Sequence, residues 1–401
     1  MFKKALSLCL AILMVATLCV SMVSCGETED EFKLGVILLH DETSTYDLNF
    51  IEAVERAAAE LGLEKDQVIY KKNIPESNAC YEAAADLVDE GCDLIFADSF
   101  GHEDFLIKAA KEFKDVQFCH ATGTKAHTEK LPNFHNAFAS IYEGRFLAGV
   151  AAGMKLNEMI EAGDITAEQA KMGYVGAFTF AEVISGYTSF YLGAKYICPS
   201  VTMEVQFTGS WYNQDEEKNA AIALMNNGCV LISQHADSMG APSACEERGV
   251  PNVSYNGSTK AACPNTFIVS SKIDWTPYFV YICKAVQNNE TIDVDWAGTI
   301  STGSVALTEV NTTAAAAGTQ AKIDEIKAKL VSGELKVFDT NTFTVGGAKL
   351  ADDHMADVDT DAKYTADTDV VDGGEFQESK FRSAPYFDLR IDGITLVNEK
   401  F

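Results

Sequence analysis

The residues best suited to chemistry lie in one short stretch, Ile232-Ser233-Gln234-His235-Ala236-Asp237-Ser238. It follows the apolar run Cys229 to Ile232, a pattern that predicts a short buried strand. Ligands of open α/β sheets bind just beyond the carboxyl ends of the strands, so these side chains would face a cleft. Asp237 is the most informative of them, because an ionised carboxylate only accepts hydrogen bonds. The other interpretation is a solvated turn in which Ser238 or Asp237 caps a helix that begins near Ala241.

The same stretch raises the question of catalysis, since Ser238, His235 and Asp237 are the residue types of a hydrolytic triad. Triad members on one short loop cannot reach one another in the required geometry, which needs separate elements. The sequence also has no G-x-S-x-G elbow and no glycine-rich phosphate motif. We therefore expect a binding protein without cofactor, not an enzyme, and a ligand without phosphate.

Metal binding is not expected either. The eleven cysteines include no C-x-x-C pair and no zinc spacing with histidine. Asp357, Asp359 and Asp361 have the opening spacing of a calcium loop, but Ala362 replaces the glycine that such a loop requires. A solvated acidic loop is the better interpretation of that segment.

The bulk composition sets the class of protein. A chain of 401 residues that is 47% hydrophobic and 22% charged is globular and long enough for about two domains. Its formal net charge of −28 argues against nucleic acid as a partner.

The amino terminus indicates export. Lys3 and Lys4 precede an apolar run from Ala5 to Val20, which is shorter than a typical membrane span. The following Met22-Val23-Ser24-Cys25 resembles the lipobox of bacterial lipoproteins. We expect residues 1–24 to be a signal peptide, Cys25 to be lipidated, and 25–32 to be a tether on the extracytoplasmic face of the cell membrane. An ordinary cleaved signal, with Cys25 incidental, is the alternative.

Beyond the tether, short apolar segments alternate with amphipathic ones, which predicts βαβ units and parallel sheets. The expected strands form two sets: 33–39, 68–72, 94–97 and 116–120, then 171–177, 202–207, 230–233, 251–255 and 266–270. Two sets of strands are what two sheets facing each other across a cleft would produce.

Nine stretches resemble the BMP (PnrA-like) family of substrate-binding lipoproteins, most of all its purine-binding branch. They lie in the family's order over roughly residues 33–310: Phe100-Gly101, His120 to Gly123, Tyr142 to Gly149, Gly173 to Phe178, Ala181 to Ile184, Gln234 to Ser238, Glu246 to Val250, Tyr255-Asn256 and Trp275 to Tyr278. The resemblance implies a type I periplasmic-binding-protein fold, with two Rossmann-like lobes of parallel sheet joined by a hinge. It also implies delivery of a small molecule to an ABC permease and its ATPase.

The resemblance suggests the domain boundaries. We expect one lobe from 33–138 with 252–292 and a second from 139–251 with 293–345. The chain would cross between them at Tyr255-Asn256 and at Ala137 to Ser140. Residues 346–401 would form an acidic C-terminal extension outside the family pattern.

A purine needs aromatic faces to stack on and a few polar groups at its edge. Candidate residues are Phe100, Phe178, Trp211 and Trp275 for stacking, Asp237 and Asn256 for the purine edge, Asp41 or Glu182 for ribose hydroxyls, and Tyr46, which matches the family's first loop. Ser44 stands where an aromatic is usual in that loop, which leaves one pocket wall uncertain. Riboflavin or a sugar remains an alternative ligand, and a signalling receptor an alternative role.

Overall fold

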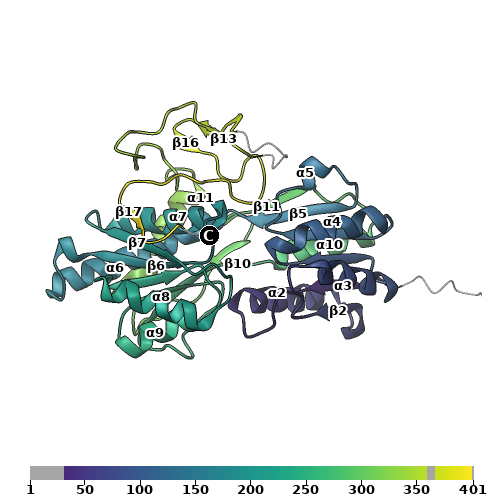
Figure 1. The fold of residues 1–401 in the computed structure, drawn as a ribbon, viewed down its shortest axis with the longest axis horizontal. Coiled ribbons are helices and arrows are strands. Elements are labelled where there is room, and N and C mark those ends of the chain that lie inside the picture. Colours follow the sequence, from purple (N-terminus) through teal and green to yellow (C-terminus); the bar gives the residue numbers. More distant parts are fainter. Residues whose placement is uncertain (1–30, 359–365, 400–401) are drawn as a thin grey trace, which may run out of the picture. The chain divides into compact units, whose positions relative to one another are not determined.

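Two β-sheets organise the chain, which a computed structural model describes over residues 31–358 and 366–399. The predicted signal peptide and Cys25 lie outside the described residues, as do Asp359 and Asp361 of the calcium-like spacing. From Lys33 onward the chain forms one compact unit, in which each sheet is covered by helices (Figure 1). No helix within the described ranges is long and apolar enough to cross a membrane.

The first sheet is entirely parallel and has the strand order β11-β5-β4-β3-β1-β2. Its strands are β1 (Leu34–Ile37), β2 (Val68–Lys71), β3 (Leu94–Ala97), β4 (Gln117–Ala121), β5 (Phe134–Ala139) and β11 (Asp295–Gly298). Its helices are α2 (Thr45–Leu61), α3 (Asn78–Asp89), α4 (Glu103–Glu112), α5 (Ala126–Glu129) and α10 (Thr276–Gln287). Helices on both faces explain why β1 and β3 are apolar and buried at every position.

The second sheet has the order β12-β10-β9-β8-β6-β7-β17, and only the pair of β10 and β12 is antiparallel. Its strands are β6 (Lys171–Gly176), β7 (Thr202–Phe207), β8 (Leu231–Gln234), β9 (Asn252–Tyr255), β10 (Phe267–Ile273), β12 (Val305–Leu307) and β17 (Ile394–Leu396). Its helices are α6 (Ile141–Ala162), α7 (Ala181–Ile197), α8 (Gln214–Asn226), α9 (Gly240–Arg248) and α11 (Thr319–Val331).

Helices α6 and α7 pack unusually closely, and two glycines permit it. A Cβ atom at Gly149 would lie 2.0 Å from the carbonyl oxygen of Phe190, and one at Gly193 would lie 2.0 Å from that of Phe146. Any larger residue at either position would therefore force the helices apart. This pair of helices is the rigid base from which the second lobe presents its part of the site.

The lobes are those of a type I periplasmic-binding protein, and the chain crosses between them at three places. The crossings follow β5 at Ser140, follow β10 near Asp274, and lie between β11 and β12. The first lies in the segment expected from the sequence. The predicted crossing at Tyr255-Asn256 is wrong, because β9 and β10 both pair within the second sheet.

Two of the predicted boundaries between the lobes are wrong for the same reason. Of the segment 252–292, only α10 belongs with the first sheet, where it packs on α2. Conversely, β11 falls in the segment 293–345 but pairs with β5 of the first lobe. Strands as short as β9 and β11, with four residues each, do not indicate from their sequence which sheet they will join.

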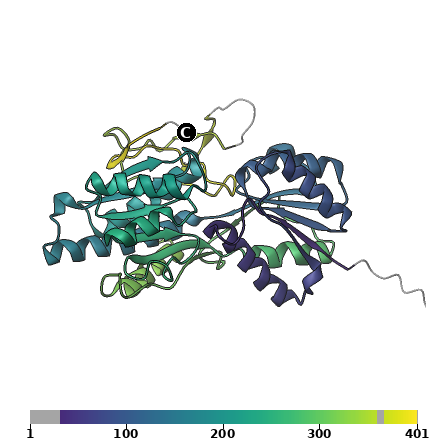
Figure 2. The same cartoon turned by 60° about the horizontal axis from the view of Figure 1, so that its bottom comes forward.

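The C-terminal segment is integrated into this fold more than its composition suggests. It contains the short strands β13 (Met355–Ala356), β14 (Thr368–Asp369), β15 (Val371–Asp372) and β16 (Glu375–Phe376), and then β17. Phe387 stacks on Phe338 with ring centroids 4.3 Å apart. The backbone N–H of Ser383 donates to Asp295 of the first lobe at 3.1 Å. Figures 1 and 2 show this yellow segment along the second lobe.

Candidate ligand-binding site

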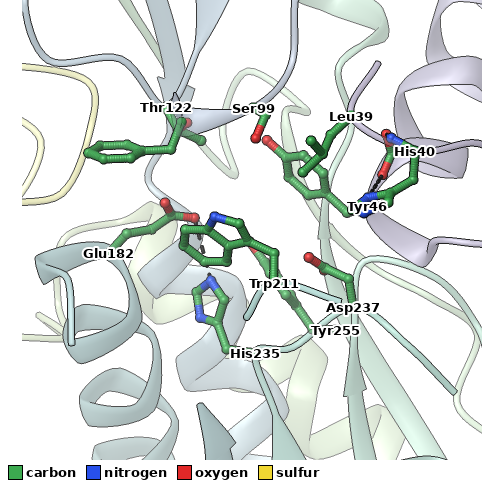
Figure 3. Close-up of a pocket in the computed structure, with 12 residues that line it drawn as sticks. Leu39, His40, Tyr46, Ser99, Thr122, Glu182, Trp211, His235, Asp237 and Tyr255 are labelled. Carbon is green, nitrogen blue, oxygen red and sulfur yellow. Dashed lines mark hydrogen bonds and ion pairs between the residues drawn. The ribbon is translucent and has the colours of Figure 1, made fainter. Parts of the chain in front are cut away.

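One pocket lies where the carboxyl ends of the two sheets face each other (Figure 3). The space between its walls is about 390 Å³, part of which is open to solvent. The residues that line it are Leu39, His40, Tyr46, Asp47, Ser99, Phe100 and Thr122 from the first lobe, and Glu182, Trp211, His235, Asp237 and Tyr255 from the second. Most of them lie within four residues after the end of a strand, as expected for ligand sites of open sheets.

The first lobe presents an ordered group of polar side chains around the start of α2. Ser44 is the N-cap of this helix and accepts a hydrogen bond from the backbone of Asp47. Asp47 in turn accepts from the backbone N–H of His40 at 2.8 Å. The Tyr46 hydroxyl donates to the backbone oxygen of Asp98 at 2.6 Å. Ser44 is therefore a buried helix cap and is not among the residues that line the pocket.

Asp47 and Asp98 form a pair of buried carboxyl groups beneath this side of the pocket. Burial and the neighbouring charge of Asp47 raise the pKa of Asp98 well above its usual value. Burial acts to raise the pKa of Asp47 as well, but hydrogen bonds from His40 and Ser44 lower it overall. Of the two groups, Asp98 therefore favours the protonated form and Asp47 the carboxylate form.

Asp237, from the stretch singled out in the sequence, lies on the opposite side of the pocket. Its backbone N–H donates to the carbonyl of Trp211 at 2.9 Å, and its carboxyl group accepts from Asn256 at 3.3 Å. Ser238 accepts a hydrogen bond from the backbone N–H of Gly240 at 3.1 Å, but the N-cap of α9 is Met239 and no side chain caps this helix. Asp237 lines the pocket, and the capping interpretation is wrong for both Asp237 and Ser238.

Glu182 and His235 form the floor of the pocket, with 3.5 Å between Oε1 of the glutamate and Nε2 of the histidine (Figure 3). Burial lowers the pKa of His235, although the contact with Glu182 opposes the shift. Burial raises the pKa of Asp237 well above its usual value, and the negative charges of Glu217, Asp47 and Glu182 add to the effect. A ligand that brings hydrogen-bond donors would relieve this concentration of carboxyl groups.

Aromatic rings form the walls. Trp211 lines the pocket, and Phe178 supports it from behind in an edge-to-face contact with centroids 5.0 Å apart. Phe180 stacks on Phe178 at 5.1 Å and also reaches Phe100 of the first lobe at 5.2 Å. The walls of the pocket are thus suited to a flat ring.

The two lobes touch across the mouth of the pocket. The backbone N–H and the hydroxyl group of Thr45 both lie within hydrogen-bonding distance of the carbonyl oxygen of Asp237, at 3.3 and 3.2 Å. The rings of His40 and Tyr212 are 5.1 Å apart. These contacts join the start of α2 to the loops after β7 and β8.

Of the nine ligand-binding residues predicted from the sequence, five line this pocket: Tyr46, Phe100, Glu182, Trp211 and Asp237. The other four do not: Asp41, Phe178, Asn256 and Trp275. Phe178 and Asn256 lie one layer behind, in contact with Trp211 and Asp237 respectively.

Asp41 and Trp275 are in other surroundings altogether. The carboxylate of Asp41 accepts from both the backbone and the hydroxyl group of Thr43 within its own loop. Trp275 is 1% exposed and stacks on Phe50 with centroids 4.6 Å apart. It belongs to the apolar core, where a buried tryptophan is most often found.

The sequence did not indicate several lining residues, notably Asp47, His40, Ser99 and Thr122. A signal existed for Asp47, since Ser44-Thr45-Tyr46-Asp47 has the spacing of a helix start with an acidic third residue. Ser99 and Thr122 follow β3 and β4 directly, so the rule that found Asp237 would have found them.

The lining residues include three carboxyl groups and two histidines but no lysine or arginine. No group of side chains among the described residues is arranged to hold a metal ion. The arrangement suits a small, flat ligand that donates hydrogen bonds and carries no negative charge.

Comparison with known proteins also indicates a protein that binds a small molecule. Residues 36–341 match the model of a family described as PnrA-like substrate-binding proteins of ABC transporters. A purine-binding protein of Brucella abortus is 30% identical over 264 residues, which cover 65% of this chain and 70% of that protein. A putative ABC transporter glucose-binding protein of Haloferax volcanii is 30% identical over 207 residues, which cover 51% of this chain and 49% of that one.

Solved structures support the fold. An ABC transporter solute-binding protein of Aeropyrum pernix superposes with a TM-score of 0.64 at 19% identity, covering 76% of this chain and 93% of that one.

Proposed function

Since the chain belongs to the PnrA-like family of ABC transporter substrate-binding proteins, we propose that it captures a purine base or nucleoside outside the cytoplasm. It would deliver this ligand to the permease and ATPase of an importer. The observation that carries the proposal is the composition of the pocket, in which aromatic walls surround three carboxyl groups and no lysine or arginine. A purine offers a flat face to Trp211 and ring or exocyclic N–H groups to Asp237 and Glu182.

Within this proposal we place a base slightly ahead of a nucleoside. An adjoining cavity shares Phe100, Thr122 and Glu182 with it and is also lined by Arg382 and Pro385 of the C-terminal segment. The ribose of a nucleoside would extend into this second space, where threonine hydroxyl groups and Glu182 would meet its hydroxyls. Free adenine would not reach this second space, which would then contain solvent.

A sugar is the second candidate, because the relative from Haloferax volcanii is described as a putative glucose-binding protein and aromatic walls suit sugar rings too. Calorimetry separates the two with a panel of adenine, adenosine, guanosine, pyrimidines, riboflavin, pentoses and glucose. Micromolar or tighter binding of a purine supports the proposal. Tight binding of glucose, a pentose or riboflavin alone would refute it.

We also propose that the protein is held at the membrane by lipid on Cys25 and that its two lobes close on the ligand by a hinge motion. The three crossing segments would supply the hinge, since they alone connect the two sheets along the chain. Opening would break the contacts of Thr45 with Asp237 and of His40 with Tyr212.

A further inference from the structure

Arg145, on α6, lies directly behind the floor of the pocket and is 1% exposed. Its Nη1 donates to the carbonyl oxygen of Gln234 at 3.1 Å, and its Nη2 lies 3.2 Å from Nδ1 of His235. The guanidinium carbon is 3.3 Å from the centre of the Tyr255 ring. A buried cation is thus placed against a histidine of the site.

The contact with Nδ1 determines where the proton of His235 resides. A guanidinium group has only donors and does not lose its charge in proteins, so Nδ1 must accept and carries no proton. A neutral imidazole has one N–H, which must then be on Nε2. Nε2 is the atom that faces Oε1 of Glu182 at 3.5 Å.

We propose that Arg145 is a positioning residue, which fixes His235 as the neutral Nε2–H tautomer and thereby holds Glu182 as a hydrogen-bond acceptor facing the ligand. The role of Glu182 towards a purine rests on the function proposed above, whereas the tautomer does not. With the opposite tautomer, Nε2 would present a lone pair to the carboxylate, and Glu182 would turn away. The ligand atom opposite Glu182 must accordingly be a donor.

A lysine at position 145 would hold the His235 tautomer poorly. The guanidinium fork reaches Gln234 and His235 at once and lies flat over Tyr255, whereas an ammonium group is a point charge without a flat face. We therefore expect Arg145→Lys to retain part of the effect and Arg145→Met to lose it.

The tautomer can be measured on the wild-type protein without ligand. A long-range ¹H–¹⁵N spectrum of protein labelled with ¹⁵N-histidine distinguishes the two tautomers and the imidazolium, and the signal lost in His235→Gln identifies His235. The expected pattern is a protonated Nε2 and an unprotonated Nδ1 at neutral pH. A protonated Nδ1, in either charge state, would overturn the proposal, whether or not any variant folds.

The variants then connect the tautomer with binding. For Arg145→Met, we expect a mixture of tautomers and a loss of affinity for adenine or guanosine of about ten- to a hundredfold. Arg145→Lys should lie between this variant and wild type. Arg248→Met on α9, where the arginine is exposed and contacts Asn226, is the matched control and should change neither property.

Unchanged tautomer and affinity in folded Arg145→Met would contradict the positioning role. If wild type binds no purine while the Nε2–H tautomer is observed, the proposed function fails alone. In that case the effect of Arg145→Met is measured with whichever compound of the panel binds.

Discussion

Asn256 donates a hydrogen bond to Asp237, with 3.3 Å between Nδ2 and Oδ1. Asn256 has a left-handed backbone with φ of 62°, and its own N–H is held by the carbonyl of Ser271. The asparagine is therefore a fixed support that orients the carboxyl group of Asp237 beside the pocket. Its place behind the ligand site, and not in it, follows from this bond.

Asp237→Asn should weaken purine binding at least tenfold, because it replaces an acceptor with a donor in a buried position. The burial of Asp237 also makes the affinity of the wild type for a purine depend on pH. The pKa of Asp237 is raised, so binding to the carboxylate should strengthen as pH rises and release a proton, and the variant should lose this dependence. Calorimetry in buffers of different ionisation heat measures both effects.

Asp41→Asn is the control for that experiment. Asp41 has the same side chain but is tied to Thr43 in its own loop, so the variant should bind like wild type. An equal loss of affinity in both variants would contradict the placement of the site.

Trp211→Ala should lower affinity by roughly ten- to a hundredfold, since stacking of a base on one aromatic is worth about 1–3 kcal/mol. Its unfolding free energy should change little by comparison with Trp275→Ala. Trp275 is packed in the core against Phe50, and the loss of such a side chain costs about 3–5 kcal/mol. Chemical denaturation and calorimetry on both variants separate the two roles, and the reverse pattern would be inconsistent with the structure.

Glu217 should make stability fall as pH rises from about 4.5 to 7. Burial raises its pKa to about 7, so the folded state holds a proton that the unfolded state has already lost in this range. Linkage then lowers the free energy of unfolding as pH rises, by at most about 3 kcal/mol. Glu217→Gln should make this slope shallower in denaturation measured across pH, because Asp98 and Asp237, whose pKa values are also raised, keep their own contributions. The exposed neighbour Glu216, changed to Gln, should leave the slope as in wild type.

Ligand should make the protein more compact in solution if the lobes close by a hinge motion. Small-angle scattering at saturating adenine or guanosine should show a smaller radius of gyration than without it. Thr45→Val removes the hydroxyl contact with the carbonyl of Asp237, so this variant should need more ligand to reach the compact form. An unchanged radius at saturation would count against hinge closure.

Cys25→Ala should release the protein from membranes if Cys25 carries the lipid. Fractionation of cells that express wild type or variant measures this directly, and Cys80→Ala is a suitable control, because Cys80 is a buried thiol of the first lobe. A variant that stays in the membrane fraction would mean that another feature anchors the chain.

The sequence predicted the two-lobed α/β fold and five pocket residues, because parallel strands place their following loops along one edge. This rule identified Asp237 and Trp211 well. The prediction also included Trp275, which stands at the start of α10, where packing against Phe50 places it in the core. It included Asp41 and missed Asp47, although of these two only Asp47 lines the pocket.

The sequence also did not predict which of the two sheets each strand joins. Strands β9 and β11 have four residues each, and nothing in their residues says which sheet they join. That choice depends on where the chain crosses, which in turn depends on packing between α10 and α2. Pairing over such distances is a property of the folded chain and not of any local pattern.

The pairing of β17 with β7 also determines when the fold can be completed. Asn398 bonds to both backbone groups of Phe207, and the two residues are 191 positions apart. This edge of the second sheet therefore stays unpaired until Ile394–Leu396 have returned to it. Until then β7 is an open edge of the kind that pairs with other chains, so a state in which β17 has not docked is the one most prone to aggregate.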